Sequence, residues 1–192
     1  MKRFLLYFAG LVLLLTQSSC GYNSMVSKDQ AVKAQVGNVQ SAYQRRSDLI
    51  PNLVNTVKGA ANFEKSTLTE VIEARAKATS VQLNADNLTP ENLKQFQEAQ
   101  SQVSAGLGRL LAVSENYPEL KANANFQELQ AQIEGTENRI NVERNKLNTL
   151  TNDYNGYIKS FPNNLFAGMF GFAEKPYFAA DAAAQKAPTV QF

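Results

Sequence analysis

The 192-residue sequence predicts an all-α fold: an antiparallel, up-down four-helix bundle with long helices, followed by an aromatic-rich, irregular C-terminal tail. Apolar residues recur at steps of three and four through most of the chain, which is the spacing of amphipathic helices. Loop signals such as Asn84–Pro90 divide this pattern into a few long segments. Helices that each carry one apolar stripe bury it by packing side by side.

Residues 1–19 predict an export signal. Lys2 and Arg3 precede an apolar run of 12 residues, Phe4–Leu15. The run is shorter than the roughly 20 residues that a membrane-spanning helix needs, so it favours a signal peptide. An uncleaved signal anchor is the alternative.

The end of this segment resembles the lipobox of bacterial lipoproteins. Ser18 and Ser19 precede Cys20, and Gly21 follows, although Gln17 stands where the lipobox prefers an aliphatic residue. The resemblance implies that Cys20 is the site of lipid attachment. With either kind of anchor, we expect a protein tethered to a bacterial membrane, with its body outside the cytoplasm, on the periplasmic face.

Residues 20–160 should form the helical body. The first helix presents Val32, Val36, Val39 and Tyr43 on one face. Because proline disfavours the α conformation in the residue before it, we predict a tight turn near residues 46–50, just before Pro51. The alternative is one kinked, continuous helix whose turn falls at residues 59–62.

The loop at Asn84–Pro90 should lead into a third helix, with Thr89 as its N-cap. Gly106 and Gly108 lie inside that helix, where glycine is unfavourable, so we expect a neighbouring helix to approach closely there. A further turn is predicted at residues 116–119.

The last helix carries the strongest periodic signal. Its apolar residues keep a seven-residue repeat over about five heptads; the main members are Phe126, Ile133, Ile140, Leu147, Tyr154 and Phe161.

Residues 161–192 form the predicted tail, which is rich in aromatic residues and in helix breakers. We expect it to contact other proteins, because aromatic side chains are enriched at interfaces. The residues assigned to this contact are Phe166, Phe170, Phe172, Tyr177, Phe178, Val190 and Phe192. The tail could instead lie on a membrane surface, or fold back over one end of the bundle.

Three blocks of the sequence resemble the signature of the LemA family. They are the words around Arg45–Gly59, Ala112–Ala122 and Thr136–Ile140, the last continuing towards Phe161 and Pro162. The resemblance covers roughly residues 22–178. It implies a helical bundle in the bacterial envelope, but no chemistry, because the biochemical role of the family is not settled.

The composition excludes most enzyme classes. The chain has no His, which removes the common catalytic triads and the usual zinc and di-iron ligand sets. Lys2 and Arg3 account for the net charge of +2, so the rest of the chain is neutral and offers no clustered basic surface for nucleic acid. We therefore expect no catalytic residue, cofactor or metal.

The polar residues beside the apolar stripes should form a structural network of Arg46, Asp48, Glu137 and Arg144, with Glu137 as the first choice of partner for Arg46. We predict a membrane-tethered, non-catalytic module that acts through contacts with other envelope proteins. An enzyme or metal-binding protein with a carboxylate-only site in the core is one alternative. An oligomeric scaffold built from copies of this chain is the other.

Overall fold

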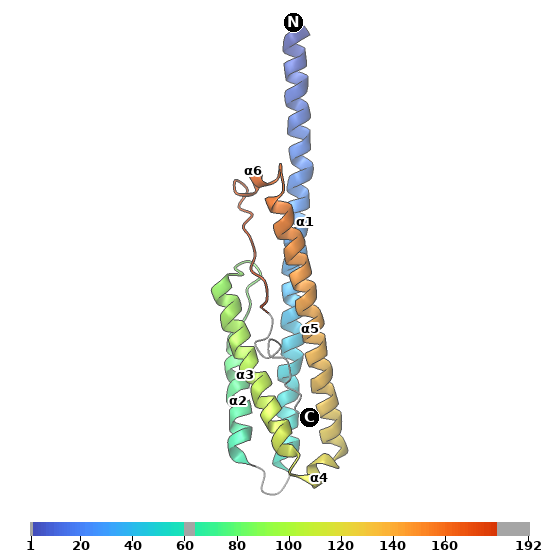
Figure 1. Cartoon of the computed structure of the whole chain (residues 1–192), viewed down its shortest axis with the longest axis vertical. Coiled ribbons are helices and arrows are strands. Elements are labelled where there is room, and N and C mark those ends of the chain that lie inside the picture. The colour runs from blue at the N-terminus through green and yellow to red at the C-terminus, as the bar shows by residue number, and fades with distance from the viewer. Residues whose placement is uncertain (1, 60–63, 180–192) are drawn as a thin grey trace, which may run out of the picture.

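The computed structural model of the chain describes residues 2–59 and 64–179, with the backbone alone for residues 2–20. Within these ranges it contains six helices and no strand: α1 (Lys2–Lys58), α2 (Lys65–Ser80), α3 (Pro90–Ser114), α4 (Pro118–Lys121), α5 (Ala124–Lys159) and α6 (Asn164–Ala167) (Figure 1). The predicted all-α class is confirmed.

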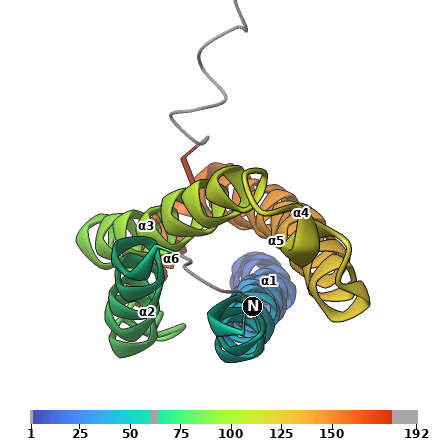
Figure 2. The same cartoon turned by 90° about the horizontal axis from the view of Figure 1, so that it is seen from below.

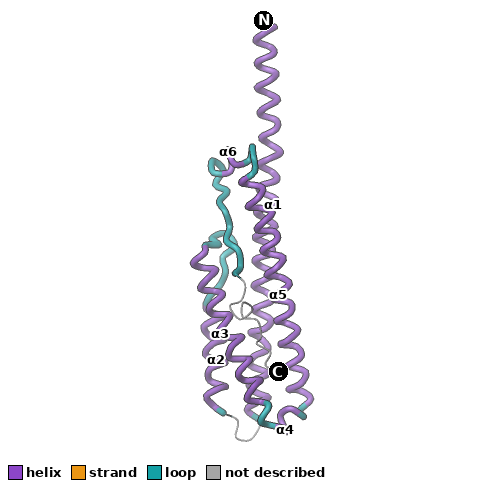
Figure 3. Tube along the Cα trace, viewed as in Figure 1, coloured by secondary structure: helices purple, strands orange, loops and turns teal. Residues whose placement is uncertain are grey.

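The four long helices associate as two pairs. α1 packs along α5, and α2 packs along α3, with fewer contacts between α1 and α2. Seen from below, α1 lies between α2 and α5 (Figure 2). The N-terminal part of α1 projects alone beyond the body, next to α6 (Figure 1). After α6 the chain returns along the body as an irregular segment (Figure 3).

The predicted apolar stripes form the core. Val32, Val36 and Val39 of α1 are buried, and so are the stripe members of α5 from Phe126 to Tyr154. The last expected member of that stripe is an exception. Phe161 follows the end of α5 at Lys159 and is 81% exposed.

The tight turn expected near residues 46–50 is wrong, because α1 continues through Pro51 to Lys58. The alternative of a continuous helix is confirmed, since α1 contains Pro51 and ends at Lys58. Of the turn that this alternative placed at residues 59–62, residues 60–62 lie outside the described residues. Proline lacks the N–H that would bond to the carbonyl of Ser47, four residues earlier. The Nε of Arg75 in α2 supplies a donor instead, 2.8 Å from the Ser47 oxygen.

Two other local expectations have different outcomes. Thr89 caps α3 as predicted, because its hydroxyl accepts from the N–H of Asn92 at 3.2 Å. Gly106 allows a close approach, since a Cβ there would lie 3.4 Å from Val71 of α2. The expectation of a close helix approach is wrong for Gly108, where a Cβ would have no neighbour within 4 Å.

Candidate contact site

A groove of about 540 Å³ runs between α3 and α5. Its α3 wall carries small residues, Ser101, Ser104, Ala105 and Gly108. Because these side chains are short, α3 leaves open space opposite α5. The α5 wall is polar and includes Glu137, Asn141 and Arg144.

Arg46 of α1 forms the floor of this groove and is only 1% exposed. Its Nη1 donates to the Ser104 hydroxyl at 2.8 Å, and its Nη2 donates to the side-chain oxygen of Gln100 at 2.7 Å. Nη1 also forms an ion pair with the carboxylate of Glu137. One guanidinium therefore connects α1, α3 and α5, and the half-exposed carboxylate of Glu137 is the member of this ion pair that remains accessible at the groove.

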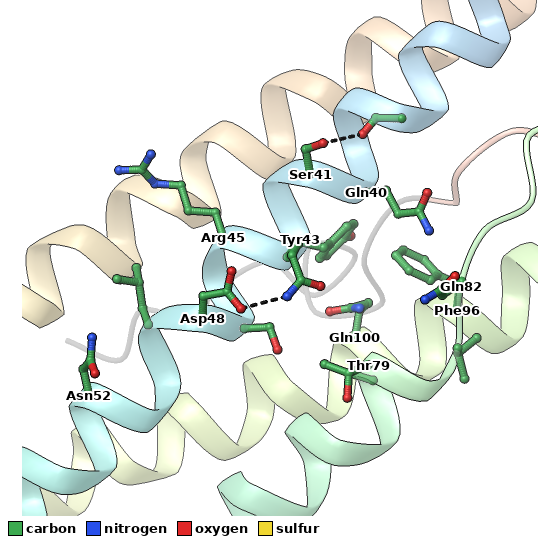
Figure 4. Close-up of a pocket in the computed structure, with 16 residues that line it drawn as sticks. Gln40, Ser41, Tyr43, Arg45, Asp48, Asn52, Thr79, Gln82, Phe96 and Gln100 are labelled. Atoms are coloured by element: carbon green, nitrogen blue, oxygen red, sulfur yellow. Dashed lines mark hydrogen bonds between the residues drawn. The ribbon is translucent and has the colours of Figure 1, made fainter.

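The structure brings Arg46 and Glu137 together but leaves Asp48 outside. Residues two positions apart on a helix do not face the same side. Asp48 lines a second groove, of about 1030 Å³, between α1 and α2 (Figure 4), where it accepts from Gln44 at 2.7 Å. Arg144 lies one heptad from Glu137, and its Nη2 donates to the carbonyl of Ala179 at 2.7 Å.

The segment that follows α6 is held against α5 by side-chain amides. Asn155 donates to the carbonyl of Lys175 at 2.8 Å and accepts from its N–H at 2.9 Å. Asn148 makes the same two bonds with Phe178, at 3.0 and 2.8 Å. Each asparagine thus binds the main chain of an extended segment, whatever side chain that segment carries.

The spacing of these amides matches an extended chain. Seven residues of helix rise about 10.5 Å, and three residues of extended chain span about 10 Å. Asn155 and Asn148 are seven residues apart, and their partners Lys175 and Phe178 are three apart. One heptad further along α5 lies Asn141, exposed on the wall of the groove. We call Asn141, Asn148 and Asn155 the asparagine row.

The predicted tail residues divide between core and surface. Phe178 is buried against Phe96 of α3, with ring centroids 6.5 Å apart. Phe166 and Phe172 are half-buried, whereas Phe170 and Tyr177 are exposed. Val190 and Phe192 lie outside the described residues.

An ion cluster fastens the same segment to α1. Asp29 lies 2.8 Å from the ammonium of Lys175 and 3.1 Å from that of Lys33, which also contacts Asp86 at 2.7 Å. Burial acts to raise the pKa of Asp29, but the hydrogen bonds from the two lysines outweigh it, so the pKa lies below its usual value.

Glu143 and Tyr154 of α5 are two further titratable groups with shifted pKa values. A hydrogen bond from Gln35 at 2.6 Å holds the pKa of Glu143 below its usual value, against the opposing effect of burial. Burial, with the nearby charge of Asp29, raises the pKa of Tyr154 to about 12. The Tyr154 hydroxyl donates to the carbonyl of Ala173 at 3.0 Å. The hydrogen bond of Glu143 joins α5 to α1, and that of Tyr154 joins α5 to the segment that follows α6.

Within residues 21–59 and 64–179, no group of three or more His, Cys, Asp and Glu side chains is placed to hold a metal ion. Nor does this part of the chain include a helix long and apolar enough to cross a membrane. What the described side chains do offer is an open groove with hydrogen-bonding groups on its α5 wall, next to an asparagine row that already binds main chain.

Comparison with known proteins agrees with the resemblance of the three sequence blocks. The LemA family model matches residues 35–192. The chain belongs to the LemA family. This LemA-family protein is 25% identical to Protein LemA of Metamycoplasma hominis over 145 residues, which cover 76% of this chain and 63% of that protein.

It is also similar to two magnetosome proteins. It shares 25% identity over 176 residues with Magnetosome protein MamQ 2 of Paramagnetospirillum magneticum, covering 82% of this chain and 64% of the relative. With Magnetosome protein MamQ of Magnetospirillum gryphiswaldense it shares 24% identity over 187 residues, or 88% and 68% of the two chains. The chain thus spans about two thirds of the length of these relatives.

The asparagine row and Arg75 were not predicted from the sequence. A signal for the row is present: an asparagine directly follows the apolar stripe residue in three successive heptads, as Ile140-Asn141, Leu147-Asn148 and Tyr154-Asn155. Arg75 could not be found from spacing, because its partner Ser47 lies 28 residues away on another helix.

Proposed function

We propose that this protein is a membrane-tethered, non-catalytic module of the bacterial envelope that holds an extended segment of another envelope protein in the groove between α3 and α5. In this proposal the four long helices work as one antiparallel, up-down body. Membership of the LemA family and similarity to magnetosome proteins support an envelope setting.

The observation that carries the proposal is how α5 holds its own tail. Asn148 and Asn155 bind main-chain groups at a repeat that matches extended chain. Asn141 continues this row into the groove, where its amide has the same position relative to the stripe. Main-chain hydrogen bonds give affinity without selecting a side chain, as in other modes of extended-peptide recognition.

The groove also offers means of selection. Glu137 presents a carboxylate that forms an ion pair with the buried Arg46. Leu107, Leu111 and Ile133 add apolar surface at the end of the groove away from Arg144. We therefore expect the bound segment to be extended and to carry an apolar residue beyond a polar or basic one.

The tether is proposed from the sequence of residues 1–20. Either Cys20 carries lipid and residues 1–19 are removed, or the apolar run Phe4–Leu15 remains as an anchor. The intact mass of the protein extracted from membranes distinguishes the two. A lipid-modified chain that begins at Cys20 supports the first form, and a chain that still begins at Met1 with a free thiol contradicts it.

A photo-activated cross-linker at Ser101, on the α3 wall, tests the groove in intact cells. The matched control places it at Asn145, which is exposed on α5 outside the groove. The proposal predicts one defined peptide from another envelope protein joined to residue 101 and absent at residue 145. If residue 101 reacts only with its own chain, or equally with many proteins, the proposal is contradicted.

A further inference from the structure

The end of the body from which α1 emerges carries an unusual share of the exposed apolar surface. Phe161, Leu165, Met169 and Phe170 are 81%, 61%, 77% and 48% exposed. We call these four residues the α6 platform. Soluble proteins rarely expose large contiguous apolar patches unless something binds there.

The four residues of the α6 platform lie in and beside the short helix α6 (Asn164–Ala167). Leu165 lies within α6, whereas Phe161 precedes Pro162 and the helix, and Met169 and Phe170 follow the helix in turns. Successive helical turns run through this segment, with Phe166 N–H bonded to Asn163 at 3.0 Å and Phe170 N–H bonded to Phe166 at 3.0 Å. Ala167 takes the buried side.

The platform is fixed to α1 at the point where α1 leaves the body (Figure 1). The ring of Tyr22 packs edge-on against Phe170, with centroids 5.1 Å apart, and against Phe172, at 5.8 Å. A Cβ at Gly21 would lie 3.0 Å from Asn163, so glycine there lets the platform segment approach α1 closely.

We propose that the α6 platform inserts into the lipid headgroup region and seats the body of the protein directly on the membrane surface. This inference rests on the proposed tether. Tyr22 lies seven residues beyond Leu15, or about 10 Å along the helix, and the headgroup layer of one leaflet is roughly 5–8 Å thick. If Cys20 carries lipid instead, Tyr22 is only about 3 Å further along the helix.

The chemistry of the segment fits lipid better than water or a charged partner. Residues 160–173 contain no charged residue. Nearby Lys159 and Glu174 are paired with each other. Insertion of this segment therefore moves no unpaired charge towards the hydrocarbon. Apolar side chains at a membrane surface insert about 5–10 Å into the boundary between headgroups and acyl chains.

The absence of tryptophan makes a direct test available, because one introduced tryptophan reports its own surroundings. The full-length protein would carry Met169→Trp in phosphatidylcholine vesicles with brominated acyl chains, whose bromine quenches nearby tryptophan. The control is Val142→Trp, at a position 59% exposed on α5 and about 25 Å from the end of that helix.

We expect Met169→Trp to lose roughly half of its emission in brominated vesicles, because interfacial side chains reach the acyl boundary. Leu165→Trp should behave alike, and Val142→Trp should lose none. Equal emission from Met169→Trp and Val142→Trp overturns the inference. Quenching that requires anionic lipid also overturns it, because basic side chains would then make the contact.

Flotation of the same samples separates this inference from the proposed tether. If the protein does not float with the vesicles, the tether itself is contradicted. If it floats while Met169→Trp remains unquenched, the tether stands and the platform does not contact lipid.

Discussion

The side-chain amide of Asn155 exchanges two hydrogen bonds with the main chain of Lys175. Asn148 repeats the exchange with Phe178 one heptad away. Through these bonds α5 fixes an irregular segment in one register, without the neighbouring strand that normally satisfies extended main chain.

Removal of one such amide should release the tail locally. We expect Asn148→Ala to lower the free energy of unfolding by about 1–3 kcal/mol, because two hydrogen bonds are lost. Hydrogen exchange at the Phe178 amide should accelerate, while amides of α2 keep their rates. Asn145→Ala, at an exposed position on α5, is the control. Unchanged exchange at Phe178 in Asn148→Ala would show that the tail is held by other contacts.

A second prediction concerns the bond between Arg75 and Ser47. Arg75→Met should destabilise the protein by about 1–3 kcal/mol, because the Ser47 carbonyl loses a charged donor. In a Pro51→Ala background the same change should cost at least ~1 kcal/mol less, since residue 51 regains the N–H that the helix uses. Denaturant unfolding of the four proteins measures both values. Equal costs in the two backgrounds mean that Arg75 does not compensate for Pro51.

The ion pair between Arg46 and Glu137 gives a third prediction. Glu137→Gln leaves the guanidinium buried without its counter-charge, whereas the carboxylate of Glu137 is 36% exposed and can reach water when Arg46 is removed. A double-mutant cycle with Arg46→Gln should therefore give a coupling free energy on the order of 1–3 kcal/mol. Strictly additive losses are the contrary result.

Tyr154 gives a prediction on alkaline stability. Its pKa is raised from 10.0 to about 12 in the folded protein. Between these values the unfolded chain loses the proton and the folded protein keeps it, so stability is full below pH 10 and falls as the pH rises towards 12. Lys33, whose pKa is also raised, adds to the loss.

Tyr154→Phe should flatten this alkaline decline without abolishing it, at the expense of the bond to Ala173 at neutral pH. Urea midpoints measured from pH 8 to pH 12 provide the comparison. A slope as steep as that of the unaltered protein would assign the alkaline loss to other groups.

The sequence was sufficient for the features that depend on local periodicity. The heptad stripe of α5, the valine face of α1 and the cap at Thr89 all follow from spacing and from residue type. The pairing of Arg46 with Glu137 was also expected, since a charged residue beside an apolar stripe needs an opposite charge when it is buried.

The remaining features depend on contacts between distant residues. Pro51 predicts a break when α1 is considered alone, whereas in the fold Arg75 of α2 donates to the Ser47 carbonyl that Pro51 leaves without its usual N–H. Gly108 predicts a close approach of a neighbouring helix, yet the lack of a side chain there contributes to an open groove. Phe161 keeps the heptad spacing but falls after α5 ends, so it joins the exposed platform and not the core.

Gly108 also provides a way to fill the groove without disturbing the core, because it lines the groove and a Cβ there would meet no atom within 4 Å. Replacing glycine by leucine in a helix should stabilise it by up to about 1 kcal/mol. Gly156→Leu on α5 is the matched control, since a Cβ at this position would also meet no neighbour within 4 Å and the position does not line the groove.

The decisive measurement is the cross-link from residue 101 in these two variants, quantified in intact cells beside thermal melts of the purified proteins. If the groove holds an extended partner segment, Gly108→Leu loses the defined cross-linked peptide and Gly156→Leu keeps it, while neither variant melts below the parent protein. If Gly108→Leu retains the same peptide in the same yield, the partner binds elsewhere and the groove is not the contact site.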